Sequence, residues 1–190
     1  MIKIGILGDI GSGKSFVAKT FGYPVFNADE EVSKLYRKDR KIFQKLKKKL
    51  PNYIFSFPIK KKEVSESILS NNSNLKKIVN IVHPEIRKKL NLFLKKNKSK
   101  KIVILDIPLL LENRINRKKD ILIFVHANKK KILKKLKKRK GFNSLLLKKF
   151  KNIQLSPEYK KNKSNFIIKN DFTKKSVKKS VKLILRKIFK

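Results

Sequence analysis

The eight residues from Gly8 to Ser15 constrain the fold more than any other part of the chain. They read GDIGSGKS and match the pattern G-x-x-x-x-G-K-[ST] at every fixed position. An apolar run at residues 2–7 precedes them, and helical spacing of apolar residues begins at Lys14. This order predicts a buried strand, a tight phosphate-binding turn and a helix, which is the P-loop arrangement.

The residue types in this turn suit the phosphates of a nucleotide. Glycines let successive backbone N–H groups point inward at a phosphate, and the start of the helix adds a partial positive charge. We expect the Lys14 ammonium to reach the β- and γ-phosphates of ATP and the Ser15 hydroxyl to bind Mg²⁺. Asp9 is not explained, because a carboxylate close to phosphates would repel them. The residues expected to contact ATP here are Gly8, Gly11, Ser12, Gly13, Lys14, Ser15 and Phe16.

Apolar runs alternate with helical spacing along the rest of the chain. Strands are predicted at residues 2–7, 102–107, 121–125 and 166–168, with a weaker one at residues 24–27, and helices at residues 14–21, 30–50, 75–94, 129–138 and 174–188. This alternation predicts an α/β fold in which helices cover both faces of a parallel sheet. Two stretches depart from it: polar residues 51–74, expected to leave the core as a small lobe, and lysine-rich residues 128–163, expected to form a lid.

The net charge of +40 suggests a nucleic-acid partner, because a basic field attracts phosphate backbones. Most of the lysines, however, are spread from residue 34 to residue 190, and aromatic residues do not alternate with them as a stacking platform requires. We therefore expect a solvated basic surface and no specific nucleic-acid partner.

Other features of the composition exclude further classes of protein. Cysteine is absent, which excludes disulfides and thiolate chemistry. No apolar run approaches the ~20 residues of a membrane span, and the apolar stretch at the N-terminus is too short for a signal peptide. We expect a cytoplasmic protein without a membrane partner.

The group that accepts the phosphate has to be sought outside the P-loop. An Asn-Lys-x-Asp segment, with which a GTPase would read guanine, is absent from the sequence. Asp29 follows the strand predicted at residues 24–27, at the sheet edge where ligands bind in open α/β folds. Its carboxylate suits a proton acceptor for an attacking hydroxyl, and equally the N-cap of the next helix. Asp106, at the end of another strand, suits a Mg²⁺-bound water or a strand-end turn.

Several segments together resemble the dephospho-coenzyme A kinase family. They are the P-loop, Phe26-Asn27-Ala28-Asp29, His83-Pro84, DIPLLLE at residues 106–112, Gln154-x-Ser156 and Ile168-x-Asn170. The resemblance runs from residue 2 to about residue 172. It implies a five-stranded parallel core with a helical lobe on the CoA side and a lid. It also implies an enzyme that uses ATP and Mg²⁺ to phosphorylate the ribose 3′-hydroxyl of dephospho-CoA, the last step of CoA synthesis.

The resemblance implies a role for each matched position. Asp29 would face the 3′-hydroxyl, and Lys14 would stabilise charge on the transferring phosphoryl group. Ser15 and Asp106 would serve the metal. On residue type alone, a histidine before proline favours a packing or capping role at a helix start, and only the resemblance brings it into the site. The residues expected on the acceptor side are Asp29, His83, Pro108, Leu109 and Glu112.

The lid contributes one further candidate. Arg139 is the single arginine of residues 128–163, and its planar fork suits phosphate oxygens. We expect it to close over the phosphates of ATP, and the alternative is that it belongs to a solvated helix face.

The sequence also departs from the family pattern. Phe16 stands where a threonine commonly follows the P-loop serine, and Lys60-Lys61 stands where the family usually has an Asp-Arg pair. In the lid, Ile132 and Lys135 replace the usual glutamine and arginine. Lysine supplies charge without a bidentate fork, so we expect weaker lid contacts.

These inferences predict one P-loop kinase domain, active as a monomer on dephospho-CoA. The core would span about residues 1–29, 75–127 and 164–190, the acceptor-side lobe residues 30–74, and the lid residues 128–163. Two alternatives stay open from sequence. One is another small-molecule or nucleotide kinase with the same core. The other is a basic nucleic-acid-binding protein with a vestigial P-loop.

Overall fold

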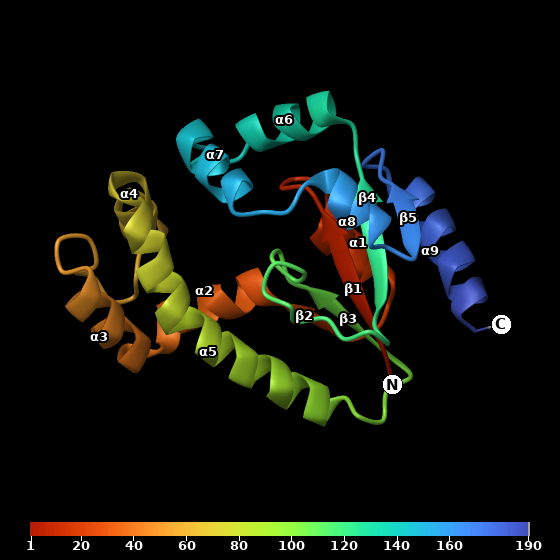
Figure 1. Cartoon of the computed structure of the whole chain (residues 1–190), viewed down its shortest axis with the longest axis horizontal. Coiled ribbons are helices and arrows are strands. Elements are labelled where there is room, and N and C mark those ends of the chain that lie inside the picture. The colour runs from red at the N-terminus through yellow and green to blue at the C-terminus, as the bar shows by residue number, and fades with distance from the viewer. Residues whose placement is uncertain (190) are drawn as a thin grey trace. The chain divides into compact units, whose positions relative to one another are not determined.

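Five strands form one parallel sheet in the computed structural model, which describes residues 1–189 (Figure 1). Their order is β2-β3-β1-β4-β5, and every neighbouring pair is parallel. Each strand agrees with its predicted range to within one residue at either end, so the predicted five-stranded parallel sheet is confirmed. The strands are β1 (Ile2–Gly8), β2 (Val25–Asn27), β3 (Ile102–Asp106), β4 (Ile121–His126) and β5 (Phe166–Lys169).

One face of the sheet is covered by α1 (Lys14–Thr20) and α9 (Lys174–Ile188). Successive residues of a strand face opposite sides, and in β1 it is Ile4 and Ile6 that point to this face. Apolar side chains of the two helices and of four strands form the core here. Its buried members are Ile4, Ile6, Val17, Ala18, Phe21, Ile102, Ile104, Ile123, Val125, Ile168, Val177, Val181 and Ile184.

The opposite face of β1 is covered by the turn after β3 and by α8 (Pro157–Asn162). A Cβ atom at Gly5 would collide with Leu110 Cδ2 and would lie 3.0 Å from Leu122 Cδ2. Gly5 is therefore required for the fully buried Leu110 to pack against the strand. Helices thus cover both faces of the sheet, as predicted.

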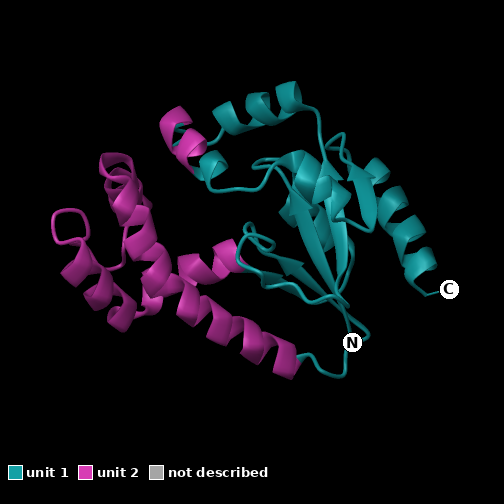
Figure 2. Ribbon diagram, viewed as in Figure 1, with its two compact units in different colours: residues 1–27, 97–143, 150–190 teal, residues 28–96, 144–149 magenta. Residues whose placement is uncertain are grey.

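Contacts between residues divide the chain into two compact units (Figure 2). The first unit holds the sheet and comprises Met1–Asn27, Asn97–Asn143 and Phe150–Lys190. The second is helical and comprises Ala28–Lys96 and Ser144–Lys149. In the second unit a long helix contacts three shorter ones and shares a buried apolar core with them. These helices are α5 (Asn72–Lys96), the long one, with α2 (Ala28–Lys38), α3 (Arg40–Lys49) and α4 (Lys61–Ser70).

Several helix boundaries follow local signals in the sequence. The helix predicted at residues 30–50 is two helices, because Asp39 has an extended backbone and its side chain accepts a hydrogen bond from Ile42 N at 3.0 Å as the N-cap of α3. The sequence interpretation missed α4, α7 (Ser144–Asn152) and α8, which lie in the stretches expected to form a polar lobe and a lid. The other predicted helices are present as α1, α5, α6 (Lys129–Lys137) and α9.

The two units differ from the domain boundaries expected from sequence. Residues 75–96 were expected in the core, but α5 is one continuous helix and its whole length belongs to the second unit. The functional assignment of an acceptor-side lobe and a lid stays a prediction. Over residues 1–189, no helix combines the length and the apolar character that crossing a membrane requires.

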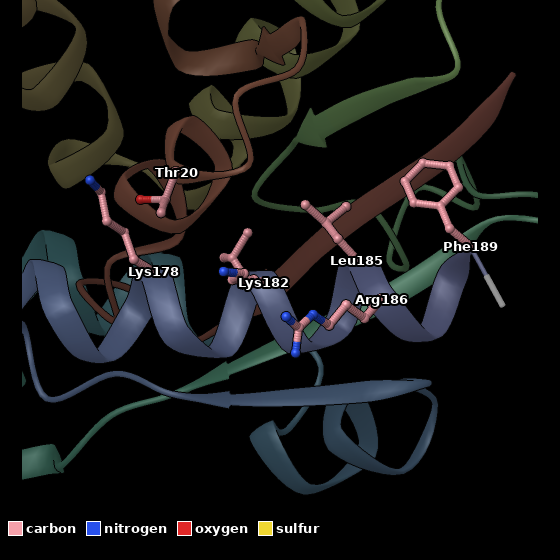
Figure 3. A pocket seen from close by; sticks show the side chains of 7 residues that line it. Thr20, Lys178, Lys182, Leu185, Arg186 and Phe189 are labelled. Atoms are coloured by element: carbon pink, nitrogen blue, oxygen red, sulfur yellow. The ribbon is translucent and has the colours of Figure 1, made fainter.

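A cavity of about 510 Å³ lies between the end of α1 and α9 (Figure 3). Three cations along α9 and the Thr20 hydroxyl border it, and Thr20 donates a hydrogen bond to Phe16 O at 2.8 Å. None of its lining residues belongs to the site predicted from sequence. They are Thr20, Lys178, Val181, Lys182, Leu185, Arg186 and Phe189.

Candidate active site

The P-loop joins β1 to α1, and its own side chains brace it. Lys14 Nζ donates hydrogen bonds to the main-chain oxygens of Gly8 at 3.2 Å and Asp9 at 2.9 Å, so the ammonium lies over the turn. Asp9 Oδ1 accepts a hydrogen bond from Ile10 N at 2.7 Å, which engages the carboxylate with its own loop. The first N–H groups of a helix have no partner within the helix, and their partial positive charge favours an anion. The loop is therefore built to receive phosphate.

Asn170, directly after β5, is hydrogen-bonded to the P-loop. The side chain is buried, and Nδ2 donates to Ser12 O at 2.8 Å while Oδ1 accepts from Phe172 N at 2.9 Å. Gly13 has a left-handed φ of 91°, and a Cβ atom there would collide with Asn170 Nδ2. Glycine is thus required at this position by the backbone and by the close approach of the asparagine.

A polar cluster lies where β2 and β3 end beside the P-loop. Asn27 Nδ2 donates to Asp106 Oδ2 at 2.6 Å and makes a longer contact of 3.5 Å with Ser15 Oγ. Asn27 and Asp106 are buried and face each other in the register of the two strands. The structure therefore brings together the two predicted metal ligands, Ser15 and Asp106, through the Asn27 amide.

Helix α6 packs against the P-loop through two buried side chains. A Cβ atom at Gly11 would lie 3.0 Å from Ile132 Cγ2 and 3.0 Å from Leu136 Cδ2. Lys135 Nζ lies 4.3 Å from the centroid of the Phe172 ring, a cation–π contact. The two lid residues that depart from the family pattern, Ile132 and Lys135, are therefore engaged in packing within the first unit.

Asp29, the predicted acid facing the acceptor hydroxyl, belongs to the second unit. Because α2 begins at Ala28, Asp29 is the second residue of the helix and does not occupy the N-cap position considered from sequence. Its side chain is exposed and shares the first turn with Glu30 and Glu31. The positive end of the helix macrodipole favours carboxylates in this turn, so the three acidic residues suit the start of α2.

His83 also belongs to the second unit and lies in the middle of α5. The helix-start role considered from sequence is wrong, because α5 continues through Pro84. Burial, and secondarily the positive charge of Arg87, lower the pKa of His83 below its usual value. The neutral imidazole is therefore favoured in the folded protein.

Glu112, predicted on the acceptor side, is held by groups of the first unit. Its Oε1 lies 2.9 Å from Lys160 Nζ and accepts a hydrogen bond from Leu155 N at 3.0 Å. The Lys160 side chain is only 2% exposed, and its ammonium also donates to Gln154 Oε1 at 3.1 Å. Glu112 Oε2 is buried without a hydrogen-bond partner among residues 1–189. This buried pair joins α8 to the turn after β3.

The remaining predicted residues lie on or near the surface. Phe16 and Arg139 are exposed, and Pro108 and Leu109 are half-buried in the turn after β3. Contacts of these four residues with ATP or with an acceptor stay predictions.

The described residues define what kind of metal site is available. Within residues 1–189 there is no group of three or more His, Asp or Glu side chains placed to hold a metal ion. The donor set at the P-loop is one hydroxyl and one carboxylate. This matches Mg²⁺, which commonly binds proteins through one or two carboxylates and completes its shell with water and substrate phosphates.

Three residues of this region were given no role from sequence. Asn27 and Asn170 were noted in the matched segments, and the signal that could have singled them out is an amide at the end of a strand beside the P-loop. Lys160 carries no such signal, since it is one of many lysines and only the folded chain reveals that it is buried.

Comparisons with known proteins identify a family for this chain. A family model described as dephospho-CoA kinase matches residues 2–176. A dephospho-CoA kinase of Wolbachia pipientis wMel is 34% identical over 187 residues, covering 96% of this chain and 95% of the relative. A second, from the Wolbachia of Brugia malayi, is 35% identical with the same coverage. The crystal structure of TT1252 from Thermus thermophilus superposes with a TM-score of 0.78 at 26% identity, covering 98% of this chain and 97% of the other.

Proposed function

Since the chain belongs to the dephospho-CoA kinase family, we propose a division of labour among Lys14, Asp29 and the Ser15–Asn27–Asp106 cluster. The enzyme transfers the γ-phosphate of ATP to the ribose 3′-hydroxyl of dephospho-CoA and so completes CoA. The observation that carries this function is an intact phosphate cradle in a chain that matches the family model over residues 2–176.

The P-loop is proposed to hold the phosphates of ATP. Lys14 Nζ rests on the carbonyl groups of Gly8 and Asp9 and can exchange these neutral acceptors for phosphate oxygens, which bind an ammonium more strongly. The Ser12 hydroxyl is buried without a hydrogen-bond partner among residues 1–189. An orphaned polar atom inside the cradle supports a ligand there.

Mg²⁺ is proposed to bind at Ser15 and Asp106. The Asn27 amide orients the Asp106 carboxylate, and one carboxylate with one hydroxyl leaves room for water and phosphate oxygens. When bound, the ion would neutralise charge on the β- and γ-phosphates. Lys14 would also stabilise negative charge on the phosphoryl group during its transfer.

Asp29 is proposed to orient the 3′-hydroxyl of the acceptor and to accept its proton. The side chain is exposed, it follows the end of β2 by two residues, and it lies in the first turn of α2. His83, Pro108, Leu109 and Glu112 are proposed acceptor-side contacts, and Arg139 a proposed lid contact. We also propose that the enzyme acts in the cytoplasm as a monomer, without a specific nucleic-acid partner.

The test is release of ADP from Mg²⁺-ATP with and without dephospho-CoA, beside a panel of nucleosides and nucleotides. We expect release that depends on dephospho-CoA, with CoA as product. Asp29→Asn should lower kcat by about 10²–10⁴-fold and leave ATP binding intact, whereas Glu30→Gln in the same helical turn should keep kcat. Unchanged turnover in Asp29→Asn would remove this carboxylate from the mechanism. Turnover with a nucleoside but not with dephospho-CoA would overturn the assigned acceptor.

A further inference from the structure

The cavity between α1 and α9 has a recessed apolar surface (Figure 3). Its volume of about 510 Å³ falls in the usual range of small-molecule pockets, about 300–1,000 Å³. Val181, Leu185 and Phe189 form the apolar part and recur at intervals of one helical turn. Val181 is buried and Leu185 is half-buried against the core of the first unit. The cavity therefore offers a ligand an apolar surface that runs along α9.

Three cations line the same cavity and have no acidic partner. Lys178, Lys182 and Arg186 also recur one turn apart, in a row beside the apolar one. None of the three forms an ion pair with another described residue, and neither α1 nor α9 contains an acidic residue. Like charges one turn apart repel each other, and an anion between them would remove this repulsion. The charge of the cavity thus favours an anionic ligand.

The lining residues give the cavity a polar end and an apolar end. Thr20, the last residue of α1, lies beside Lys178 and Lys182, whereas Leu185 and Phe189 lie further along α9 (Figure 3). At 1.5 Å per residue, the helix advances about 10 Å from Lys182 to Phe189. A ligand that matches both ends carries one anionic group and an extended apolar body of about this length.

We propose that this cavity binds the anion of a medium-chain fatty acid, with its carboxylate between Lys178 and Lys182 and its alkyl chain extending toward Phe189. Ammonium groups form charge-assisted hydrogen bonds with a carboxylate, and the chain leaves water by packing on the apolar row. A bilayer surface fits less well, because it requires an apolar face that projects, and Val181 and Leu185 are recessed. The proposal is independent of the proposed function, since no lining residue is assigned to ATP, Mg²⁺ or the acceptor.

The experiment titrates the purified enzyme with decanoate by calorimetry at low ionic strength, with hexanoate as a shorter probe. We expect decanoate to bind at least about 10-fold more tightly, because its additional methylene groups leave water. Lys178→Gln/Lys182→Gln should weaken decanoate binding by at least about 10-fold. The matched control, Lys175→Gln/Lys179→Gln, removes the same charge from exposed positions of α9 outside the cavity and should change the dissociation constant by less than about 2-fold.

A second pair of variants tests the apolar end of the cavity. Phe189 and Leu183 are 52% and 50% exposed, but only Phe189 lines the cavity. Phe189→Ser should weaken decanoate binding by about 5-fold, because the end of the chain loses its apolar contact. The same change should leave hexanoate binding unaltered, since the shorter chain does not reach Phe189. Leu183→Ser should change the affinity for neither probe.

Several results would overturn the proposal. The unaltered enzyme could fail to bind decanoate, or could bind decanoate and hexanoate equally, which would mean that the chain makes no contact. Equal losses in the two lysine double variants would indicate general attraction to a basic surface. Complete displacement of decanoate by Mg²⁺-ATP would place it at the P-loop. Binding to phosphatidylglycerol vesicles that Phe189→Ser abolishes and Leu183→Ser preserves would assign this face to a membrane instead.

Discussion

Two asparagine side chains position the segments that form the phosphate cradle of this enzyme. Asn170 bridges the P-loop and the turn after β5 with both ends of its side chain, and Asn27 joins β2 to Asp106 on β3. An amide suits both places because it donates and accepts in one plane. Neither residue is proposed to touch the transferring phosphoryl group, so each is expected to act on binding and positioning rather than on the chemical step.

Replacing Asn170 with alanine should weaken ATP binding. The change removes the donor to Ser12 O and leaves this buried carbonyl without its partner, at a cost of about 1–3 kcal/mol in stability. Because the P-loop loses this hydrogen bond, we expect KM for ATP to rise by about 10-fold, with a smaller effect on kcat. Steady-state kinetics and urea unfolding measure the two effects.

The matched control for this prediction is Asn165→Ala. Asn165 Oδ1 also accepts from a backbone group, Leu122 N at 2.8 Å, but at the start of β4, far along the strand from the P-loop. This variant should lose stability without a change in KM for ATP. A similar KM shift in both variants would mean that general loosening of the sheet, and not the Ser12 contact, controls ATP binding.

Among the helices, α8 depends on one buried ion pair. Lys160 is almost fully enclosed and binds Glu112 and Gln154, so α8 and the turn after β3 hold each other in place. The desolvation cost of burying the Lys160 ammonium is offset only while its carboxylate partner is present. A residue that resembles the surface lysines in sequence is thus a structural element of the core.

Lys160→Met should destabilise the protein by about 3–5 kcal/mol, because Glu112, only 11% exposed, is left without its cation. The double variant Lys160→Met/Glu112→Gln removes both charges and should recover a large part of the loss. Chemical unfolding of the two single variants and the double variant gives the coupling energy. If the double variant loses the sum of the two single losses, the pair makes no specific contribution to stability.

The elements of this fold were predictable from sequence to unequal degrees. Strands were found to within a residue because buried parallel strands are apolar along their whole length. Helices α4, α7 and α8 were missed, since they are rich in serine, lysine and asparagine and two of them are short. The break at Asp39 was missed because an N-cap inside a polar stretch gives a weak signal among so many lysines.

The candidate site follows the same pattern. The P-loop and the Ser15–Asp106 pair were predictable, because glycine spacing and strand ends place them together. The partner of Glu112 was not, since the pair links residues 48 positions apart whose types occur throughout the chain. The position of Asp29 inside α2 and of His83 inside α5 also needed the structure, because the helix starts are not marked by their caps.

Across the whole molecule, cations outnumber carboxylates about fourfold, with 53 lysines and arginines against 13 aspartates and glutamates. Exposed ion pairs, such as that between Lys62 and Glu66 at 3.8 Å, add little stability. Self-repulsion among the remaining cations opposes the compact state. Along α9 the effect is local as well, since Lys178 and Lys182 lie one turn apart on the helix face that borders the cavity (Figure 3).

The melting temperature should therefore rise with ionic strength. Going from about 10 mM to about 150 mM sodium chloride shortens the Debye length from about 30 Å to about 8 Å, which screens repulsion across the surface while the buried Lys160–Glu112 pair is screened far less. Differential scanning calorimetry without nucleotide or phosphate measures this dependence. Lys178→Gln/Lys182→Gln should melt higher at low salt and depend less steeply on salt, because a like-charge pair has been removed from α9. A melting temperature that falls with salt would mean that attractive ion pairs outweigh repulsion between the lysines in this enzyme.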